Sequence, residues 1–337
     1  MKIQENISLK PYNTFGIDKN ARFFTVAESI ADFKEALIFS KEKKIPAIIL
    51  GGGSNILLTQ DQNALIVKNE IKGIKVTKES ENEVFVEVGA GENWHEWVLF
   101  SISQGWSGIE NLSLIPGTVG ASPMQNIGAY GVEIKDVFHS LKALNRETLE
   151  LEAFDFETCD FGYRESVFKN KLKGKYIICE VTYRLSKQPV FNISYGAIQE
   201  TLKAHGIQEL SIKAISDAVI EIRQSKLPDP AQIGNSGSFF KNPTVPAEQF
   251  EKLKELYPTI PGYPNENGVK LAAGWLIEQA GWKGYKEGSI GVHDKQALVL
   301  VNHGGGDGAQ VAKLSEKIQK SVFEKFNVKL SPEVNFL

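Results

Sequence analysis

The sequence is short of the residues that build metal and disulfide sites. Its 337 residues include two cysteines, Cys159 and Cys179, which lie 20 positions apart and outside any C-x-x-C motif. We therefore expect both to be free thiols. The five histidines also lack the spacing of metal ligands. These shortages argue against a metal hydrolase, and we predict no bound metal.

Long apolar runs and surplus charge are absent as well. Aliphatic runs such as "ALVLV" (Ala297–Val301) are far shorter than a membrane span, and the start of the chain contains no apolar core of a signal peptide. The formal net charge is -3, so no general basic field exists to hold nucleic acid or acidic lipid. We expect a cytoplasmic protein that binds neither nucleic acid nor membrane.

The patterns that are present predict a globular chain of mixed α and β structure. Hydrophobic residues make up 42% of the chain, enough for large cores, and the length favours two or three domains. Residues 23–27, 28–44 and 45–50 predict a strand, a helix and a strand of one βαβ unit. Three segments between Ala64 and Val88 alternate apolar and polar residues, which predicts strands of a mostly antiparallel sheet.

A linker is predicted at Ser225–Pro230, "SKLPDP". Its two prolines end a helix predicted at residues 211–224, because proline fits neither a helix interior nor a central strand. The remaining sequence predicts a separate α+β unit. Its expected elements are helices near residues 247–257, 269–280 and 309–326, a strand at 297–301 and a final strand at 332–337.

Two glycine-rich loops of low charge lie in the first half of the chain. The first, "GGGSN", spans Gly51–Asn55, and the second lies within Glu110–Glu133. Glycines let backbone N–H groups turn toward an anion such as a pyrophosphate, although each loop taken alone also fits an ordinary turn. A third stretch, "GGGDGA" (Gly304–Ala309), fits G-x-G-x-x-A, but too little chain follows it to complete a dinucleotide fold. We predict a surface loop there.

The segment "GNSGSFFKNP" (Gly234–Pro243) sets two serines among glycines. A nucleophile elbow needs glycine two positions before and after its serine, and neither Ser236 nor Ser238 has both. Taken alone, the segment predicts a turn that leads into a strand ending at Pro243.

Seven segments, in the same order along nearly the whole chain, together resemble the UDP-N-acetylenolpyruvoylglucosamine reductase family, also called UDP-N-acetylmuramate dehydrogenases. The long second loop and "GSFFKNP" are the most specific of them. The segments are "NTFG" (Asn13–Gly16), "GGGSNILL" (Gly51–Leu58), "GAG" (Gly89–Gly91), "ENLSLIPGTVGASPMQNIGAYG" (Glu110–Gly131), "YRES" (Tyr163–Ser166), "GSFFKNP" (Gly237–Pro243) and "PEVNF" (Pro332–Phe336).

The resemblance implies a flavoenzyme of peptidoglycan precursor synthesis. Such an enzyme uses FAD and NADPH to reduce UDP-N-acetylglucosamine enolpyruvate to UDP-N-acetylmuramate. The implied fold class is α+β, with a two-part, non-Rossmann FAD-binding domain and a separate substrate-binding domain. We place the two FAD-binding lobes at residues 1–67 and 68–226, the second with a tyrosine loop near 190–205, and the substrate-binding domain at 227–337. We expect a monomer.

The resemblance also implies which residues hold the cofactor and the substrate. The glycine loops would bind the FAD pyrophosphate, and a loop of the longer subclass, "SYG", would close over the substrate. The cofactor residues are Gly51, Gly53, Ser54, Asn55, Pro116, Gly117, Gly120, Ala121, Gln125, Asn126, Gly128, Ala129, Tyr130, Gly131 and Tyr163, and the substrate residues are Tyr195, Lys226, Asn242 and Gln296.

Three residues match the catalytic positions of the family. Hydride from the flavin would reach the enolpyruvyl methylene carbon, and the neighbouring carbon would need charge stabilisation and a proton. Arg164 would bind the carboxylate through its planar fork. Glu333, protonated or sharing a proton, would stabilise the developing charge. Ser238 would donate the proton, as a general acid and not as a nucleophile.

Other functions remain open beside this one. The chain could be another FAD-dependent oxidoreductase of the same two-part fold, or a flavin- or nucleotide-binding protein without turnover. A serine hydrolase is disfavoured by the incomplete elbow around Ser236 and Ser238.

Overall fold

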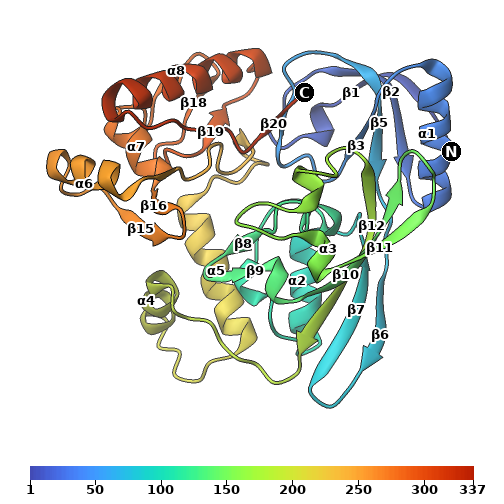
Figure 1. Ribbon diagram of the computed structural model, residues 1–337, viewed down its shortest axis with the longest axis horizontal. Helices are drawn as coiled ribbons and strands as arrows, with labels where there is room; N and C mark the ends of the chain where they lie inside the picture. The colour runs from blue at the N-terminus through green and yellow to red at the C-terminus, as the bar shows by residue number, and fades with distance from the viewer. The chain divides into compact units, whose positions relative to one another are not determined.

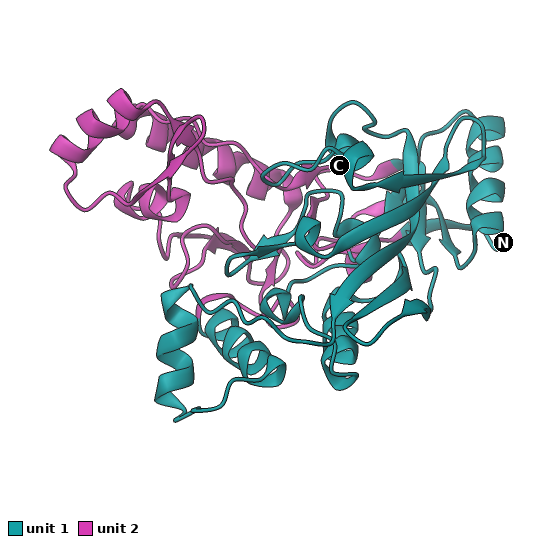
Figure 2. Ribbon diagram, turned by 60° about the horizontal axis from the view of Figure 1, so that its bottom comes forward, with its two compact units in different colours: residues 1–7, 21–52, 63–225 teal, residues 8–20, 53–62, 226–337 magenta.

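The computed structural model describes all 337 residues, which form two compact units (Figures 1 and 2). Unit 1 consists of residues 1–7, 21–52 and 63–225, and unit 2 of residues 8–20, 53–62 and 226–337. Unit 2 therefore takes two segments from the N-terminal part of the chain. Both units mix helices and sheets, so the expected α+β fold class is confirmed.

The first sheet of unit 1 contains the expected βαβ unit. Helix α1 (Ile30–Lys43) begins at Ser29, whose side chain accepts a hydrogen bond from the N–H of Asp32 at 3.2 Å, and it packs on the sheet through Phe33 and Leu37. The strands, in sheet order, are β1 (Gln4–Ser8), β2 (Asn20–Ala27), β5 (Gln62–Asn69) and β3 (Ala47–Leu50). Strand β5 pairs parallel with β3, so the antiparallel arrangement predicted for the residues after Ala64 is wrong for this strand.

The second sheet of unit 1 has five strands paired antiparallel. Their order is β11 (Leu151–Asp155), β10 (Phe138–Asn145), β12 (Tyr176–Ser186), β7 (Glu83–Gly89) and β6 (Ile74–Glu79). Helix α2 (Trp94–Ser103) buries Trp94 and Trp97 in the core beside this sheet, while α3 (Phe156–Cys159) is short. Unit 1 therefore contains two sheets, one with the parallel pair β3 and β5 and one that is antiparallel.

The long loop that follows α2 is ordered by short elements and not by a regular period. It contains the 3-10 helices η2 (Glu110–Leu112), η3 (Val119–Ala121) and η4 (Ile134–Asp136). It also contains the small hairpin of β8 (Gly128–Ala129) and β9 (Val132–Glu133). A further 3-10 helix outside this loop, η5 (Val167–Lys169), directly follows the "YRES" turn.

Helices α4 (Gly196–Ala204) and α5 (Ile212–Lys226) lie side by side at one edge of unit 1 (Figures 1 and 2). They share a small core of buried residues: Ile198, Leu202, Ile215, Ala218, Val219 and Ile222. Helix α5 ends at the proline-containing segment, as predicted, because proline cannot continue the helix.

Unit 2 is built from short strands and three helices. The first sheet has four strands, in the order β13 (Gly234–Asn235), β19 (Leu300–Asn302), β18 (Ile290–Val292) and β17 (Lys286–Glu287). The second has three, in the order β14 (Thr244–Val245), β16 (Gly268–Leu271) and β15 (Gly262–Asn265). The third is the parallel pair β20 (Asn335–Phe336) and β4 (Ile56–Leu57). The three helices are α6 (Ala247–Leu256), α7 (Ala273–Gln279) and α8 (Gly308–Phe326). Unit 2 also contains the 3-10 turn η1 (Lys10–Tyr12).

Two predicted elements of unit 2 have different limits in the structure. The helix predicted from residue 269 begins at Ala273, because Gly268–Leu271 pairs with β15 in a hairpin. The stretch "GGGDGA" is the entrance to α8, where Asp307 caps the helix by accepting the N–H of Ala309 at 2.7 Å. A Cβ at Gly308 would clash with the carbonyl oxygen of Leu58, so close packing explains that glycine.

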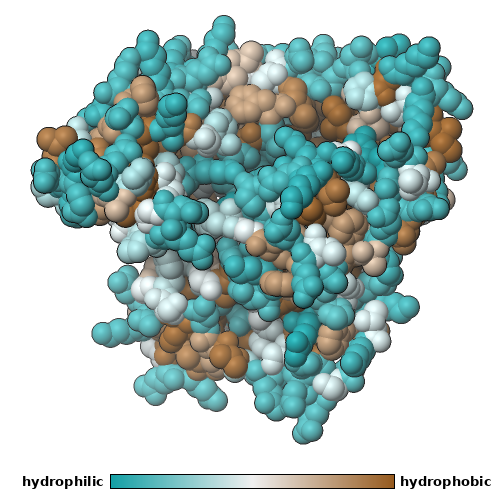
Figure 3. All heavy atoms as spheres, in the orientation of Figure 1, coloured by the Kyte–Doolittle hydropathy of each residue, from teal (hydrophilic) through white to brown (hydrophobic).

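Polar residues dominate the face of the molecule in Figure 3, and hydrophobic residues form only small groups on it. No helix has both the length and the apolar character needed to cross a membrane. Both cysteines are free and buried, and burial raises the pKa of each thiol to about 12. Neither thiol is therefore a reactive thiolate near neutral pH.

Candidate functional site

Within unit 1, Gly51 and Gly52 of the first glycine loop meet the second loop. A Cβ at Gly51 would lie 2.8 Å from Oγ1 of Thr118, and a Cβ at Gly52 would lie 2.8 Å from the Cα of Gly117. Side chains at these positions would push the loops apart, so glycine is required by contact and not only by turn geometry.

Several backbone N–H groups of these loops donate no hydrogen bond within the protein. In unit 1 they belong to Gly52, Gly117 and Thr118. In unit 2 the N–H groups of Gly53 and Ser54 are likewise unpaired, and Gly53 has φ +65°, a left-handed conformation that turns successive N–H groups to one side. Unpaired backbone donors in glycine-rich turns are the chemistry of an anion site, and the donors of unit 1 fit a pyrophosphate such as that of FAD.

Other predicted cofactor residues have structural roles in the same loop. The N–H of Gly120 donates to the carbonyl of Ala90 at 2.9 Å, and that of Ala121 donates to Thr118 at 3.0 Å. The amide of Asn126 is buried and donates to the carbonyl of Gly162 at 3.0 Å. These three groups shape the loop and are not free donors. Pro116 is exposed, Gln125 is half-buried, and Gly128, Ala129, Tyr130 and Gly131 form the hairpin.

Arg164 lies at the tip of a tight turn in unit 1. Its φ is +56°, uncommon for a residue with a side chain, and Gly162 pairs with Glu165 across the turn. The guanidinium donates to the carbonyl of Gly128 at 2.6 Å and lies 5.9 Å from the ring centre of the half-exposed Tyr163. The turn thereby directs Arg164 at the hairpin, although this geometry costs backbone strain.

A second arginine, Arg223 on α5, was not predicted. Its Nε donates to the carbonyl of Leu114 at 3.2 Å, and its side chain is hydrogen-bonded to Tyr130. Burial lowers the pKa of Arg223; Tyr130 opposes this shift, and the positive charge of Arg164 adds to it. Neither arginine forms an ion pair with a carboxylate. Two neighbouring guanidiniums without a carboxylate favour an anionic ligand.

Tyr195 stands at the start of α4, where 51% of its surface is exposed. Its ring packs edge-on against the ring of Tyr130, with centroids 5.2 Å apart. Burial raises the pKa of Tyr130, Arg223 opposes that shift, and Tyr195 adds to it. The structure therefore brings Tyr195 together with Tyr130, the residue that Arg223 contacts.

In unit 2, Ser238 lies on a turn supported by segments from distant parts of the chain. A Cβ at Gly234 would clash with the carbonyl oxygen of Phe15, and the N–H of Asn235 donates to the carbonyl of Thr14 at 3.0 Å. Asn235 Oδ1 in turn accepts the N–H of Gly237 at 2.9 Å. The "NTFG" segment thus fixes the turn, and Ser238 itself is exposed.

Glu333 is a backbone neighbour of Ser238. Its N–H donates to the carbonyl of Phe239 at 2.8 Å, and Phe240 pairs with Pro332 in an isolated bridge. The carbonyl of Glu333 accepts Nδ2 of Asn55 at 3.3 Å. The structure therefore brings together Ser238, Glu333 and Asn55, which are far apart in the sequence, and the Glu333 side chain is half-buried.

The remaining predicted substrate residues of unit 2 differ in their contacts. Asn242 Oδ1 accepts the N–H of Ala273 at 2.9 Å and so supports the start of α7. Gln296 Oε1 accepts the N–H of Leu298 at 3.3 Å, and the carbonyl of Leu298 accepts the N–H of Phe239. Gln296 is thereby linked to the Ser238 turn, whereas Lys226 is exposed and makes no ion pair.

Ser236 is only 7% exposed, and its buried hydroxyl has no hydrogen-bond partner. We expect Ser236→Ala to raise the free energy of unfolding by about 1 kcal/mol, because it removes an unsatisfied buried hydroxyl. Urea unfolding of the variant measures this change, with Ser238→Ala as the matched control at an exposed serine. Lower stability of Ser236→Ala would show that its hydroxyl has a partner.

Some site residues were missed because no sequence motif marks them. Arg223 lies on a regular helical face, where an arginine is usually solvated, and only its contacts with Leu114 and Tyr130 distinguish it. Gly52 could have been predicted, since it belongs to the same glycine run as Gly51. Its contact with Gly117 is visible only in the folded structure.

Two models of known protein families match the chain. Residues 21–149 match the family model described as "FAD binding domain". Residues 229–337 match the model described as "UDP-N-acetylenolpyruvoylglucosamine reductase, C-terminal domain". The first match covers the glycine loops, and the second covers Ser238 and Glu333.

Known proteins resemble the chain over its full length. The UDP-N-acetylenolpyruvoylglucosamine reductase of Amoebophilus asiaticus is 53% identical, with 100% of both chains covered, and that of Pseudomonas putida is 51% identical, with 98% of both covered. A crystal structure of the reductase from Thermus caldophilus has a TM-score of 0.70 at 22% identity and covers 100% of this chain and 99% of its own, which shows a shared fold. The chain belongs to the UDP-N-acetylenolpyruvoylglucosamine reductase family of FAD-containing oxidoreductases.

Proposed function

We propose that this protein catalyses the NADPH-dependent, FAD-mediated reduction of UDP-N-acetylglucosamine enolpyruvate to UDP-N-acetylmuramate, a step of peptidoglycan precursor synthesis. Its full-length identity with reductases of that name carries the proposal. The unpaired N–H groups of the glycine loops and the adjacency of Ser238 and Glu333 support it. The FAD-binding role is assigned to residues 1–67 and 68–226, and the substrate-binding role to 227–337.

The glycine loops are proposed to hold the FAD pyrophosphate. In unit 1, the N–H groups of Gly52, Gly117 and Thr118 are the donors available for it. When bound, FAD supplies hydride chemistry that no side chain can supply. Arg223 adds a positive charge next to the second loop, and Tyr163 adds an aromatic surface beside Arg164.

Arg164 is proposed to bind the carboxylate of the enolpyruvyl group. Its guanidinium already donates one hydrogen bond, to the carbonyl of Gly128, which leaves further N–H donors for a ligand. A planar guanidinium can engage a carboxylate through two parallel hydrogen bonds and stays charged when water is excluded. The strained turn holds the group in place before the ligand arrives.

Ser238 is proposed to donate the proton that completes the reduction, and Glu333 to stabilise charge on the substrate carboxylate. A hydroxyl is a weak acid, but a carbanionic carbon is a strong base, so transfer is feasible in a dry and oriented site. The fixed turn at Gly234–Gly237 supplies the orientation. Lys226, Asn242, Gln296 and Tyr195 are proposed to contact the sugar nucleotide, with Lys226 as the cation for its phosphates.

The proposal is tested by the absorbance of the purified protein under anaerobic conditions. We expect a flavin band at about 450 nm, bleached by NADPH and restored by the enolpyruvyl sugar nucleotide. A colourless protein would contradict the cofactor assignment. Bleaching followed by rapid reoxidation by oxygen, but not by the sugar nucleotide, would indicate an oxidase instead.

A further inference from the structure

The buried side chain of Asn111 joins two segments of unit 1 that are distant in the sequence. Asn111 lies in η2 and is 1% exposed. Its Nδ2 donates to the carbonyl of Tyr130 at 3.0 Å and to the carbonyl of Asn192 at 2.8 Å. Both hydrogens of the amide are used, so one side chain connects the β8–β9 hairpin to the segment before α4.

The side chain of Asn192 makes the reverse connection. Its Nδ2 donates to the carbonyl of Gly131 at 2.9 Å, and its Oδ1 accepts the hydroxyl of Ser194 at 2.8 Å and the N–H of Ser194 at 3.3 Å. A Cβ at Gly131 would lie 2.9 Å from Nδ2 of Asn192, so a side chain at residue 131 would meet the amide of Asn192. We call this group of hydrogen bonds, made by Asn111 and Asn192, the asparagine clamp.

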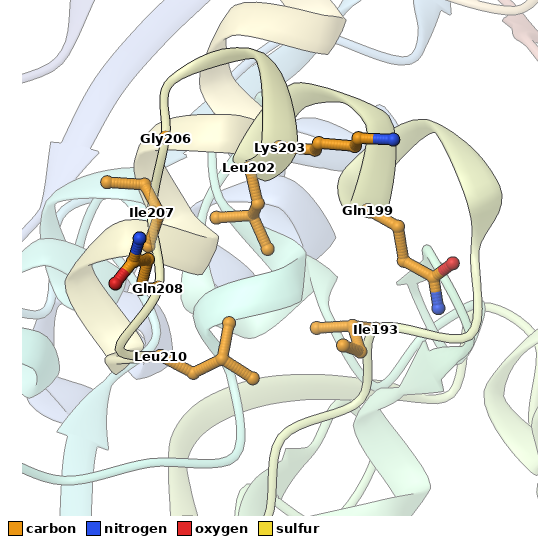
Figure 4. Close-up of a pocket in the computed structure, with 8 residues that line it drawn as sticks. All are labelled: Ile193, Gln199, Leu202, Lys203, Gly206, Ile207, Gln208 and Leu210. Carbon is orange, nitrogen blue, oxygen red and sulfur yellow. The ribbon is translucent and has the colours of Figure 1, made fainter.

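The asparagine clamp stands directly before Tyr195. Beyond it, a pocket of about 330 Å³ lies beside α4. Figure 4 shows Ile193, Leu202 and Leu210 pointing toward this space, from the helix and from the segments before and after it. The clamp therefore supplies the polar contacts of the segment that leads into α4.

We propose that Asn111 and Asn192 are positioning residues that hold Tyr195 against Tyr130, where it meets the substrate. This inference rests on the proposed function for its substrate. Without the clamp, Tyr195 would sample more positions, and binding would have to meet the cost of ordering it. The clamp and Arg164 both contact the β8–β9 hairpin, the clamp at the carbonyls of Tyr130 and Gly131 and Arg164 at the carbonyl of Gly128. The clamp makes no hydrogen bond with Arg164, Ser238 or the unpaired loop donors, so we expect it to act on binding and not on the chemical step.

The test compares Asn192→Ala with Lys203→Gln, a control on the exposed face of α4 that changes no hydrogen bond of the clamp. Amide hydrogen exchange followed by mass spectrometry should show faster exchange over residues 192–204 in Asn192→Ala only. We expect its KM for the enolpyruvyl sugar nucleotide to rise about tenfold, the size of one or two neutral hydrogen bonds, with kcat and flavin reduction by NADPH unchanged. Asn192→Asp keeps the acceptor for Ser194 but sets a carboxylate oxygen against the carbonyl of Gly131, so its KM should rise at least as far as that of Asn192→Ala.

The proposal would be overturned by unchanged hydrogen exchange over 192–204 in Asn192→Ala, or by an unchanged KM. A fall in flavin reduction equal to the loss of turnover would also overturn it, since that result would assign Asn192 to the cofactor. If the proposed function itself is wrong, the unsubstituted protein will not turn over the sugar nucleotide. The exchange comparison still decides whether the clamp orders Tyr195 in that case.

Discussion

Ser238→Ala should retain its flavin and be reduced by NADPH at the normal rate, yet lose oxidation by the enolpyruvyl sugar nucleotide by about 10²–10⁴-fold, the range for one general acid. The reason is geometric. The turn is held by Asn235 and by the "NTFG" segment, and no hydrogen bond of the Ser238 side chain contributes to it. Removing the hydroxyl should thus leave the structure intact. Stopped-flow absorbance separates the two half-reactions.

Ser236→Ala is the matched control for this prediction, because its hydroxyl is buried two positions away on the same turn. We expect normal rates for both half-reactions in Ser236→Ala. Ser238→Cys, which restores a proton donor at the same position, should recover part of the lost rate. Normal turnover in Ser238→Ala would remove the hydroxyl from the mechanism, and slow reduction by NADPH would show that it supports the cofactor instead.

Local sequence patterns predicted the long elements of the fold, because apolar periodicity and capping residues act over short distances. Helix α8 carries a 3.6-residue apolar period and begins at Asp307, and α5 ends at the predicted prolines. The composition of unit 2 could not be predicted in this way. Residues 8–20 and 53–62 join it through contacts such as Asn235 with Thr14 and Asn55 with Glu333, and such contacts leave no local pattern.

The site divides in a similar way. The resemblance named Ser238 and Glu333, and the structure makes them neighbours through the bond between Glu333 and Phe239. The resemblance could not identify which backbone N–H groups of the loops are unpaired, since that depends on the whole hydrogen-bond network. Gly120 was predicted among the cofactor residues, and the structure shows that its N–H donates to the carbonyl of Ala90. Asn111 is an ordinary loop residue in sequence and becomes informative only through its two bonded carbonyls.

Glu333→Gln should show the same separation of half-reactions as Ser238→Ala, with flavin reduction by NADPH unchanged and oxidation by the sugar nucleotide slowed by about 10²-fold. The backbone of Glu333 is held by its N–H to Phe239 and by Asn55 at its carbonyl, so its position does not depend on the side chain. Glutamine keeps the size and a hydrogen-bond donor but cannot share a proton with the substrate carboxylate.

The series at position 333 tests what the side chain supplies. If Glu333 stabilises developing charge through a shared proton, Glu333→Ala should be slower than Glu333→Gln, because alanine removes the donor altogether. Glu251→Gln, at an exposed position on α6, is the control for the change of charge and should leave both half-reactions unaffected. Equal rates for Glu333→Gln and Glu333→Ala would mean that the proton and not the hydrogen bond is what matters. A collapse of reduction by NADPH would show that Glu333 acts on the cofactor, and the charge-stabilising role would then be wrong.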